Sequence, residues 1–171
     1  MENKEKFYIF MDIDGVLWDW SWRLKAIKDG EILNKLQIEQ FNPESVKALN
    51  YLLFNLEKKY DCCLVVSSSW RGNMEKTIDV LMKNKVNLTG KTLATPIFSN
   101  PKNRGGEIFS VVKKNNIKNF VIIDDETFNF NEKFEQKNII KTNLSHGSLK
   151  MDDVSTWLKQ QSNKTECEQI K

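Results

Sequence analysis

Residues Phe7–Leu17 read FYIFMDIDGVL, and they decide how the rest of the chain is interpreted. The apolar run before Asp12 is typical of a buried strand, which delivers two carboxylates, two positions apart, onto Gly15. Alternate residues of a strand point to the same side, so Asp12 and Asp14 can face one site where the strand ends. Buried neighbouring carboxylates repel unless a cation lies between them or they share a proton. The stretch therefore predicts a functional acidic site.

A turn or a calcium loop could also contain these residues. Asp and Gly are common in turns, so the motif can be the cap and turn of a loop. A calcium loop needs further oxygen ligands at regular spacing and a final glutamate, whereas Val16, Leu17 and Trp18 follow here. The calcium loop is excluded, and the rest of the chain must decide between a turn and a catalytic motif.

The composition is that of one ordinary globular domain. The 171 residues are 40% hydrophobic and 29% charged, which suffices for a hydrophobic core that needs no disulfide or structural metal. A net charge of +3 does not require nucleic acid, although it would not oppose an anionic substrate. Residues 2–6 (ENKEK) are mostly charged and give no signal-peptide pattern. No apolar run is long enough to span a bilayer. We expect a cytoplasmic protein without membrane contact and infer no obligate protein partner.

Three cysteines, Cys62, Cys63 and Cys167, form neither a metal-binding spacing nor an even set for disulfides. Cys62 and Cys63 open an apolar strand. They are therefore expected to be small buried hydrophobic residues in a reducing compartment.

Strand-like and helix-like segments alternate along the chain. Strands are predicted at residues 7–12, 64–66, within 93–98, 120–123 and 138–141. Four helices are predicted: one begins at Asn42-Pro43, one covers about 73–85, one begins at Asn103, and the last includes 154–158. This order is typical of an α/β, Rossmann-like parallel sheet with helices on both faces. We expect one domain over residues 1–160, an irregular stretch over 16–40, and a polar, disordered tail over 161–171.

Apolar spacing and caps support the individual helices. Asn42 and Asn103 are predicted caps, and Pro43 suits a first helical position. In the helix over 73–85, Ile78, Leu81 and Met82 are expected on the inner face.

Polar groups follow three of the predicted strands: Asp12 and Asp14, then Ser67, then Asp124 and Asp125. Ligands of open parallel α/β sheets bind at the carboxyl ends of the strands. One pocket could therefore gather all three groups, and this convergence is stronger evidence than any single motif.

Carboxylates without a histidine or thiolate cluster make an all-oxygen site, which favours Mg²⁺. Asp12 and Asp124 are the best direct ligands, with Asp125 binding directly or through water. Ser67 can hold a phosphate oxygen, and Arg104 lies at a helix start, where the helix dipole also favours an anion.

Each of these two assignments has a structural alternative. Ser67 can be a simple helix cap, and Ser68 competes with it for the phosphate. Arg104 can be a solvated residue of the first turn, and Lys102 competes with it for the same role.

In family order, these motifs resemble those of the haloacid dehalogenase (HAD) superfamily of phosphohydrolases, over roughly residues 7–158. DIDGVL resembles the first motif, VVS ending at Ser67 the second, Arg104 the third, and IIDD ending at Asp125 the fourth. The runs SSWR (68–71), RGGEI (104–108) and KTNLSHGSL (141–149) are similar to the branch named for Swiss Army Knife RNA repair proteins. The resemblance implies a HAD-like fold.

The resemblance also implies a reaction. Asp12 would attack phosphorus and form an aspartyl phosphate, while Asp14 would act as general acid and then base. Mg²⁺, Ser67 and Arg104 would neutralise the phosphoryl group. Asp12, Asp14, Asp124 and Asp125 would form the metal site, and Gly15, Trp18 and Ser68 would contact the substrate. Arg71 could contact the substrate or pair with an acid. In this superfamily, an Asp at the second acidic position of the first motif separates phosphatases from dehalogenases, so Asp14 argues against cleavage of a carbon–halogen bond.

Neither the stretch from Asp14 to Ser67 nor that from Ser67 to Arg104 has room for a full cap domain. An open site suits a large or terminal phosphate, such as a nucleotide, a nucleic-acid end or a phosphoprotein. Three alternating tryptophans, Trp18, Trp20 and Trp22, could stack a base or could pack over the core in place of a cap. His146, the single histidine, is given no role.

Two alternatives lack catalysis. A receiver-type signalling domain also gathers acids, a hydroxyl and a cation, but its phosphorylated Asp follows a middle strand, where serines stand here. The second alternative is a phosphate-binding module that has lost turnover. The presence of every motif residue argues against it. Multiple-turnover phosphate release distinguishes both from a phosphatase.

Overall fold

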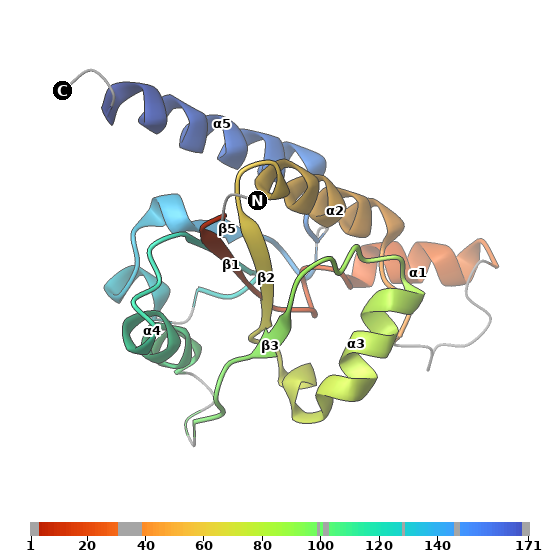
Figure 1. Ribbon diagram of the computed structural model, residues 1–171. Helices are drawn as coiled ribbons and strands as arrows, with labels where there is room; N and C mark the ends of the chain where they lie inside the picture. The colour runs from red at the N-terminus through yellow and green to blue at the C-terminus, as the bar shows by residue number, and fades with distance from the viewer. Residues whose placement is uncertain are drawn as a thin grey trace.

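The computed structural model describes residues 4–30, 39–98, 100, 103–127, 129–145 and 148–168. Within these residues, a five-stranded parallel sheet has the order β3-β2-β1-β4-β5 (Figure 1). Its strands are β1 (Lys6–Met11), β2 (Asp61–Val66), β3 (Thr92–Ala94), β4 (Phe120–Asp124) and β5 (Ile139–Lys141). The predicted α/β class with a parallel sheet is confirmed.

Helices cover both faces of the sheet. They are α1 (Trp20–Lys28), α2 (Pro43–Glu57), α3 (Met74–Lys83), α4 (Arg104–Lys114) and α5 (Met151–Glu168), with short 3₁₀ segments η1 (Ser69–Asn73), η2 (Phe130–Glu132) and η3 (Gln136–Asn138). α2 and α5 lie side by side over one face, and α4 lies against the other (Figure 1). The chain runs from β1 out to β3 and then returns to β4, so the topological switch lies beside β1.

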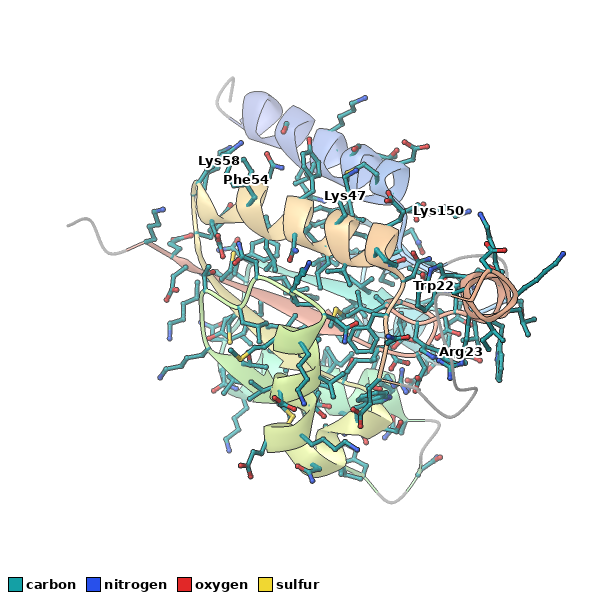
Figure 2. All side chains as sticks on the ribbon, turned by 90° about the vertical axis from the view of Figure 1, so that its right-hand side faces the viewer. Trp22, Arg23, Lys47, Phe54, Lys58 and Lys150 are labelled. Atoms are coloured by element: carbon teal, nitrogen blue, oxygen red, sulfur yellow. The ribbon has the colours of Figure 1, made fainter. Side chains whose placement is uncertain are left out.

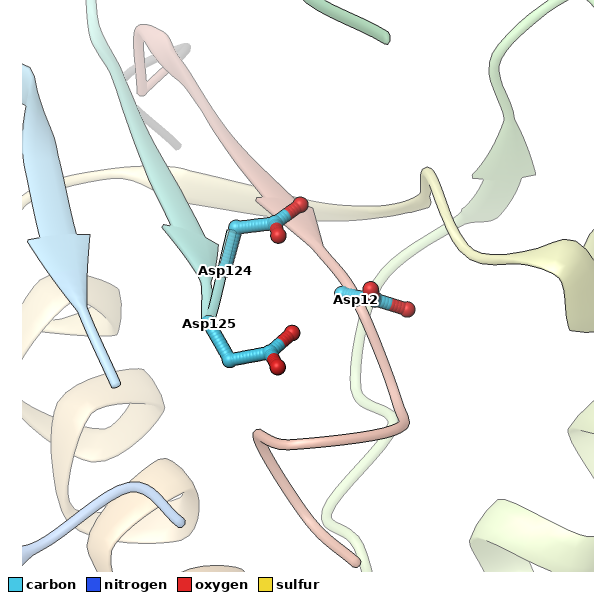
Figure 3. A group of neighbouring side chains, drawn as sticks. All are labelled: Asp12, Asp124 and Asp125. Atoms are coloured by element: carbon cyan, nitrogen blue, oxygen red, sulfur yellow. The ribbon is translucent and has the colours of Figure 1, made fainter. Parts of the chain in front are cut away.

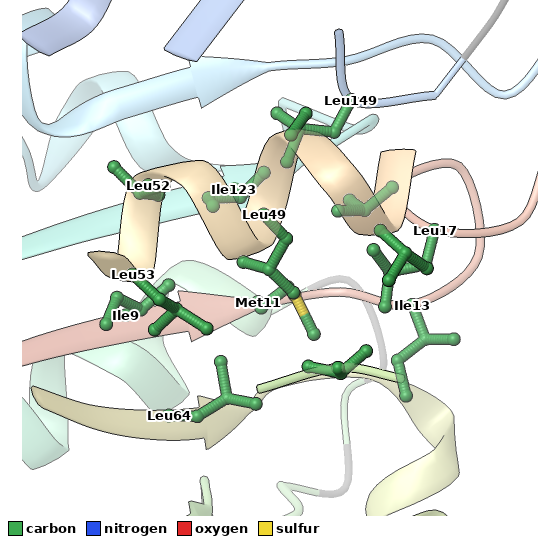
Figure 4. Close-up of a cluster of buried hydrophobic side chains, with 14 of the residues drawn as sticks. Ile9, Met11, Ile13, Leu17, Leu49, Leu52, Leu53, Leu64, Ile123 and Leu149 are labelled. Carbon is green, nitrogen blue, oxygen red and sulfur yellow. The ribbon is translucent and has the colours of Figure 1, made fainter. Parts of the chain in front are cut away.

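The central strand β1 is buried on both faces because its side chains alternate. Ile9 and Met11 belong to the core beneath α2 and α5, whereas Phe10 packs on the opposite side with Ile108 of α4. Figure 4 shows Leu49 of α2 over Met11 in the first of these cores. Packing on both sides fixes the end of β1, where the acidic residues begin.

Helix α2 forms as the sequence predicts. The Asn42 side chain accepts a hydrogen bond from the Glu44 backbone N–H (3.0 Å), and Pro43 occupies the first turn. Its apolar residues at helical spacing are all buried: Val46, Leu49, Leu52, Leu53 and Leu56. The cap and the apolar face therefore act together to place this helix on the sheet.

Two segments differ from their predictions. The sequence predicts an irregular stretch over 16–40, but α1 lies within it and is started by Asp19, whose side chain accepts a hydrogen bond from Trp22 N–H (2.8 Å). α5 continues past Gln160 to Glu168, into the segment for which a disordered tail is predicted.

Two details of α3 and α4 are also wrong in the sequence prediction. Met82 is 62% exposed, and Thr77, Val80 and Leu81 form the inner face of α3, because the helix is rotated from the predicted phase. Asn103 precedes α4 but makes no capping hydrogen bond; its side-chain oxygen accepts one from Asn129 instead (3.1 Å).

Cys62 and Cys63 are buried, as predicted. Burial, reinforced by the charge of Glu57, raises the pKa of Cys62 to about 12, so its thiol stays protonated. In the part of the chain that the structure describes, no helix has the length and apolar character of a membrane span. His146 and Lys102 lie outside the described residues.

Candidate active site

The carboxyl ends of β1, β2 and β4 meet at one edge of the sheet. The strand register puts Asp12, Ser67 and Asp124 in one row. Two backbone hydrogen bonds carry the pairing into this row: Ser67 N–H donates to the Met11 carbonyl (2.9 Å), and Asp12 N–H donates to the Ile123 carbonyl (3.0 Å). Polar groups that are far apart in the sequence are thus neighbours beside the topological switch.

Three carboxylates form the acidic centre of the site. Asp12, Asp124 and Asp125 each offer an oxygen, and these oxygens lie within 4.8 Å of one another (Figure 3). Asp14, predicted as a fourth ligand, is not in this group. Hard oxygen donors at this spacing fit Mg²⁺, which binds a few carboxylates and keeps several waters.

Arg104 brings a positive charge to this centre from the first turn of α4. Its guanidinium pairs with Asp12 and, at 2.7 Å, with Asp124. Burial alone would lower the pKa of Arg104, but the charges of Asp124 and Asp12 outweigh burial and raise it. Arg104 is therefore always charged and lies at the acidic centre, where its role in binding phosphate stays a prediction.

Burial, and then mutual repulsion, raise the pKa values of the acids in this site. Burial, and then the charge of Asp12, raise the pKa of Asp125 to about 6. The same two causes raise the pKa of Asp124 and that of Asp14. A bound cation would relieve this repulsion, so the electrostatics of the site agree with its oxygen geometry.

We expect the metal-free protein to lose stability as pH rises through about 6. Raised pKa values mean that the folded state binds these protons more tightly than the unfolded state, whose Asp groups titrate near pH 4. The stabilisation is complete below about pH 4 and disappears above the folded-state pKa of Asp125, about 6. Thermal unfolding with EDTA and with Mg²⁺, at pH 5.5 and 7.5, checks this.

Excess Mg²⁺ should raise the unfolding midpoint more at pH 7.5 than at pH 5.5, because protons compete with the metal for the same oxygens. Asp125→Asn should weaken this difference. A stabilisation by Mg²⁺ that is larger at pH 5.5 would contradict the assignment of the acidic centre.

Gly15 allows the chain to turn tightly against Asp125. Its φ of +75° lies in the left-handed region, and a Cβ built there would lie 2.3 Å from Cγ of Asp125. Its carbonyl accepts a hydrogen bond from the Thr142 hydroxyl (2.7 Å). Gly15, predicted to contact substrate, thus borders a carboxylate of the acidic centre.

Gly15→Ala should weaken Mg²⁺ binding by about tenfold or more, because the new methyl group displaces the Asp125 carboxylate. Gly30→Ala is the matched control: its φ is +77°, but nothing lies within 4 Å of its Cβ position. Titration calorimetry with Mg²⁺ compares the two variants. Equal Mg²⁺ affinities in both variants would show that the contact between Gly15 and Asp125 is unimportant.

The two predicted serines differ in their surroundings. Both are buried, but the Ser67 hydroxyl lies in the row with Asp12 and has no hydrogen-bond partner within the described structure. The Ser68 hydroxyl accepts a long hydrogen bond from Trp70 N–H (3.5 Å) at the start of η1. A buried hydroxyl without a partner is costly, so Ser67 is the better candidate for a phosphate oxygen.

Arg71 is used inside the protein. Its guanidinium donates to the carbonyls of Ser67 (2.5 Å) and Ser68 (3.0 Å) and pairs with Glu107 (2.8 Å). Glu107, on α4, also accepts from Phe98 N–H (2.8 Å) and is 2% exposed. Of the two expectations for Arg71, contact with substrate or a pair with an acid, the structure shows the pair with an acid, and this pair joins the serine loop after β2 to the helix that carries Arg104. A glutamate on an ordinary helix gives no sequence signal of this role.

Trp18 is buried as well, at 7% exposed, and packs in the core, so its predicted contact with substrate is not supported. Arg23 of α1, beside Trp22 in Figure 2, lies over the Trp18 ring with its guanidinium carbon 5.6 Å from the centroid. The rings of Trp20 and Trp18 are in T-shaped contact, with centroids 4.7 Å apart, but Trp20 is 51% exposed. Of the two ideas for these residues, Trp18 fits packing, whereas Trp20 keeps a surface free for stacking.

The chain is similar to one protein family and to one solved structure. A family model described as the HAD domain in Swiss Army Knife RNA repair proteins matches residues 8–154. Among solved structures, the chain is similar to a haloacid dehalogenase-like hydrolase from Streptococcus pneumoniae, with 15% identity and a TM-score of 0.45, over 89% of this chain and 90% of that one. A search of the curated proteins gives no match. The family match includes every residue of the acidic centre.

Proposed function

The chain belongs to the family of HAD domains in Swiss Army Knife RNA repair proteins, and from this premise we propose that it is a Mg²⁺-dependent phosphomonoesterase. One observation carries the proposal: oxygens of Asp12, Asp124 and Asp125 lie within 4.8 Å of one another, with Arg104 paired to two of these residues. Such a site can bind a divalent cation and a phosphoryl group together.

In the proposed reaction, Asp12 is the nucleophile. One carboxylate oxygen attacks phosphorus, the bond to the leaving oxygen breaks, and an aspartyl phosphate forms. The Ile13 backbone N–H donates to Asp12 Oδ1 (2.7 Å), and Arg104 donates to Oδ2. The carboxylate is therefore held from both sides, which orients it before the substrate arrives.

Asp14 acts as general acid and then as general base. It first gives a proton to the leaving oxygen. It next takes a proton from the water that attacks phosphorus, and the bond between phosphorus and Asp12 breaks to release phosphate. Burial and the charge of Asp12 raise the pKa of Asp14, which favours its protonated form for the first step.

The remaining residues bind charge. Arg104 and the Ser67 hydroxyl would hold oxygens of the transferred phosphoryl group, where preorganised donors are most effective. Asp12, Asp124 and Asp125 would hold Mg²⁺, which when bound neutralises charge on that group. Each role uses a residue at the carboxyl edge of the sheet.

The substrate is proposed to be a nucleotide or a nucleic-acid end carrying a terminal phosphate. Between Asp14 and Arg104, the described residues form α1, α2, β2, η1, α3 and β3, and none of these makes a separate domain over the site. The exposed Trp20 ring offers a surface on which a base can stack. The RNA repair in the family's description agrees with this class of substrate.

Phosphate release tests the proposal. The panel contains nucleoside monophosphates, oligonucleotides phosphorylated at the 5′ or 3′ end, and sugar phosphates, each with Mg²⁺ and with EDTA. We expect many turnovers on at least one nucleotide or oligonucleotide and none with EDTA. If the protein binds Mg²⁺ but releases no phosphate from any substrate, a regulatory or phosphate-binding domain becomes the better account.

A further inference from the structure

Trp70, in η1, reaches across the site to the predicted general acid. Its indole N–H lies 3.3 Å from Oδ1 and 3.2 Å from Oδ2 of Asp14, so it is shared between both oxygens. We propose that Trp70 is a positioning residue, which orients the Asp14 carboxyl for proton transfer to the leaving oxygen. This inference rests on the proposed phosphatase function and adds a residue to its machinery.

The indole itself is held in place. The Trp70 ring packs against the buried Phe41 ring, with centroids 5.8 Å apart, and its backbone carbonyl accepts a hydrogen bond from the Thr77 hydroxyl (2.8 Å). The next residue, Arg71, is fixed by its ion pair with Glu107. The indole is therefore held by contacts of its ring, its backbone carbonyl and the neighbouring Arg71. Because it cannot move with the Asp14 carboxylate, its hydrogen bond fixes the orientation of that carboxylate.

The contact has a specific chemical consequence. When Asp14 gives its proton to the leaving oxygen, negative charge develops on the carboxylate that faces the indole N–H. A hydrogen bond to a developing charge is stronger than one to the neutral acid, so it lowers the barrier. The hydrogen bond lowers the barrier only for substrates whose leaving oxygen needs that proton, such as an alkyl phosphate. The leaving oxygen of an aryl phosphate departs as a stable anion.

The test compares kcat/KM of Trp70→Phe on two esters, because kcat/KM reports on the step in which the leaving group departs. On a nucleoside 5′-monophosphate, we expect a loss of about tenfold, the usual effect of one hydrogen bond to a charged group. On 4-nitrophenyl phosphate, the loss should stay below about twofold. Phe keeps the ring that packs on Phe41 and removes the donor.

Three further comparisons make the test specific. Trp157→Phe removes an indole N–H that donates to the Lys137 carbonyl (2.8 Å), in a ring packed on Phe7 at the far end of β1, and should leave both rates unchanged. In Asp14→Asn, adding Trp70→Phe should cost little more, because Trp70 acts through Asp14. A protein with 3-benzothienylalanine at position 70 keeps the ring shape without the N–H. It should show the same loss of about tenfold on the nucleotide and below about twofold on 4-nitrophenyl phosphate, so it tests the proposal even if Trp70→Phe folds poorly.

The outcomes separate this inference from the proposed function. Equal losses on both esters, no loss on either, or full additivity with Asp14→Asn would overturn the role of Trp70 while leaving the phosphatase intact. A wild-type protein without turnover on any ester would overturn the phosphatase itself, and the role of Trp70 with it.

Discussion

Asp12→Asn is expected to reduce steady-state phosphate release by at least about 10³-fold, because an amide cannot attack phosphorus in place of the carboxylate. The fold should survive, since Asn has the same shape and the charge of Asp12 is one of the causes that raise the pKa of Asp14, Asp124 and Asp125. Removing that charge relieves repulsion among the acids, and Arg104, which loses its ion pair with Asp12, keeps its ion pair with Asp124. The thermal midpoint of the metal-free variant should therefore equal or exceed that of the wild type at pH 7.5.

Asp152→Asn is the matched control for this variant. Asp152 is exposed in the first turn of α5, so the same chemical change there should leave turnover unaffected. Retained turnover in Asp12→Asn would remove Asp12 from the role of nucleophile. Loss of turnover together with a lowered midpoint would point to misfolding rather than to lost chemistry.

Arg104→Ala should produce the second largest effect, on stability and on activity together. Arg104 is 14% exposed and pairs with Asp124, whose side chain is fully buried, so the variant leaves two facing carboxylates without their cation. Breaking a buried ion pair on one side costs about 3 kcal/mol or more. Loss of a preorganised donor to the phosphoryl oxygens should lower kcat by roughly 10²-fold.

The two parts of this prediction are measured separately. Urea unfolding at pH 7.5 should show the full loss of stability with EDTA and a smaller loss with excess Mg²⁺, because a bound cation replaces part of the missing charge. Arg104→Lys retains a positive charge and should lose far less stability than Arg104→Ala. Stability equal to the wild type in Arg104→Ala would mean that the ion pairs at the carboxyl edge are not formed in solution.

The sequence predicts the sheet and its acidic edge well, because both depend on local patterns. The apolar run before Asp12, the run before Asp124 and the cap at Asn42 each lie within a few residues of what they specify. Parallel topology then brings the strand ends together by a general rule, so Asp12 and Asp124 could be expected to be neighbours.

The contacts between side chains could not be predicted in this way. Arg71 and Glu107 are 36 positions apart, and Trp70 and Asp14 are 56 apart. Each pair is set by the packing of separate elements on the sheet. The burial of Trp18 could not be predicted either, since an alternating run of tryptophans does not reveal which ring turns toward the core. The structure assigns that place to Trp18 and leaves Trp20 exposed.

The most direct test of the central claim is a rapid-quench experiment with the best substrate from the phosphate-release panel. Acid quenching within the first turnover, followed by mass spectrometry of the peptides, locates any phosphoryl group on the chain. We predict a phosphoryl group on Asp12 that forms before phosphate appears and decays at the rate of phosphate release. A phosphorylated Asp12 that persists without release would indicate a receiver-like domain, and turnover with no phosphoryl group on Asp12 would contradict the proposed mechanism.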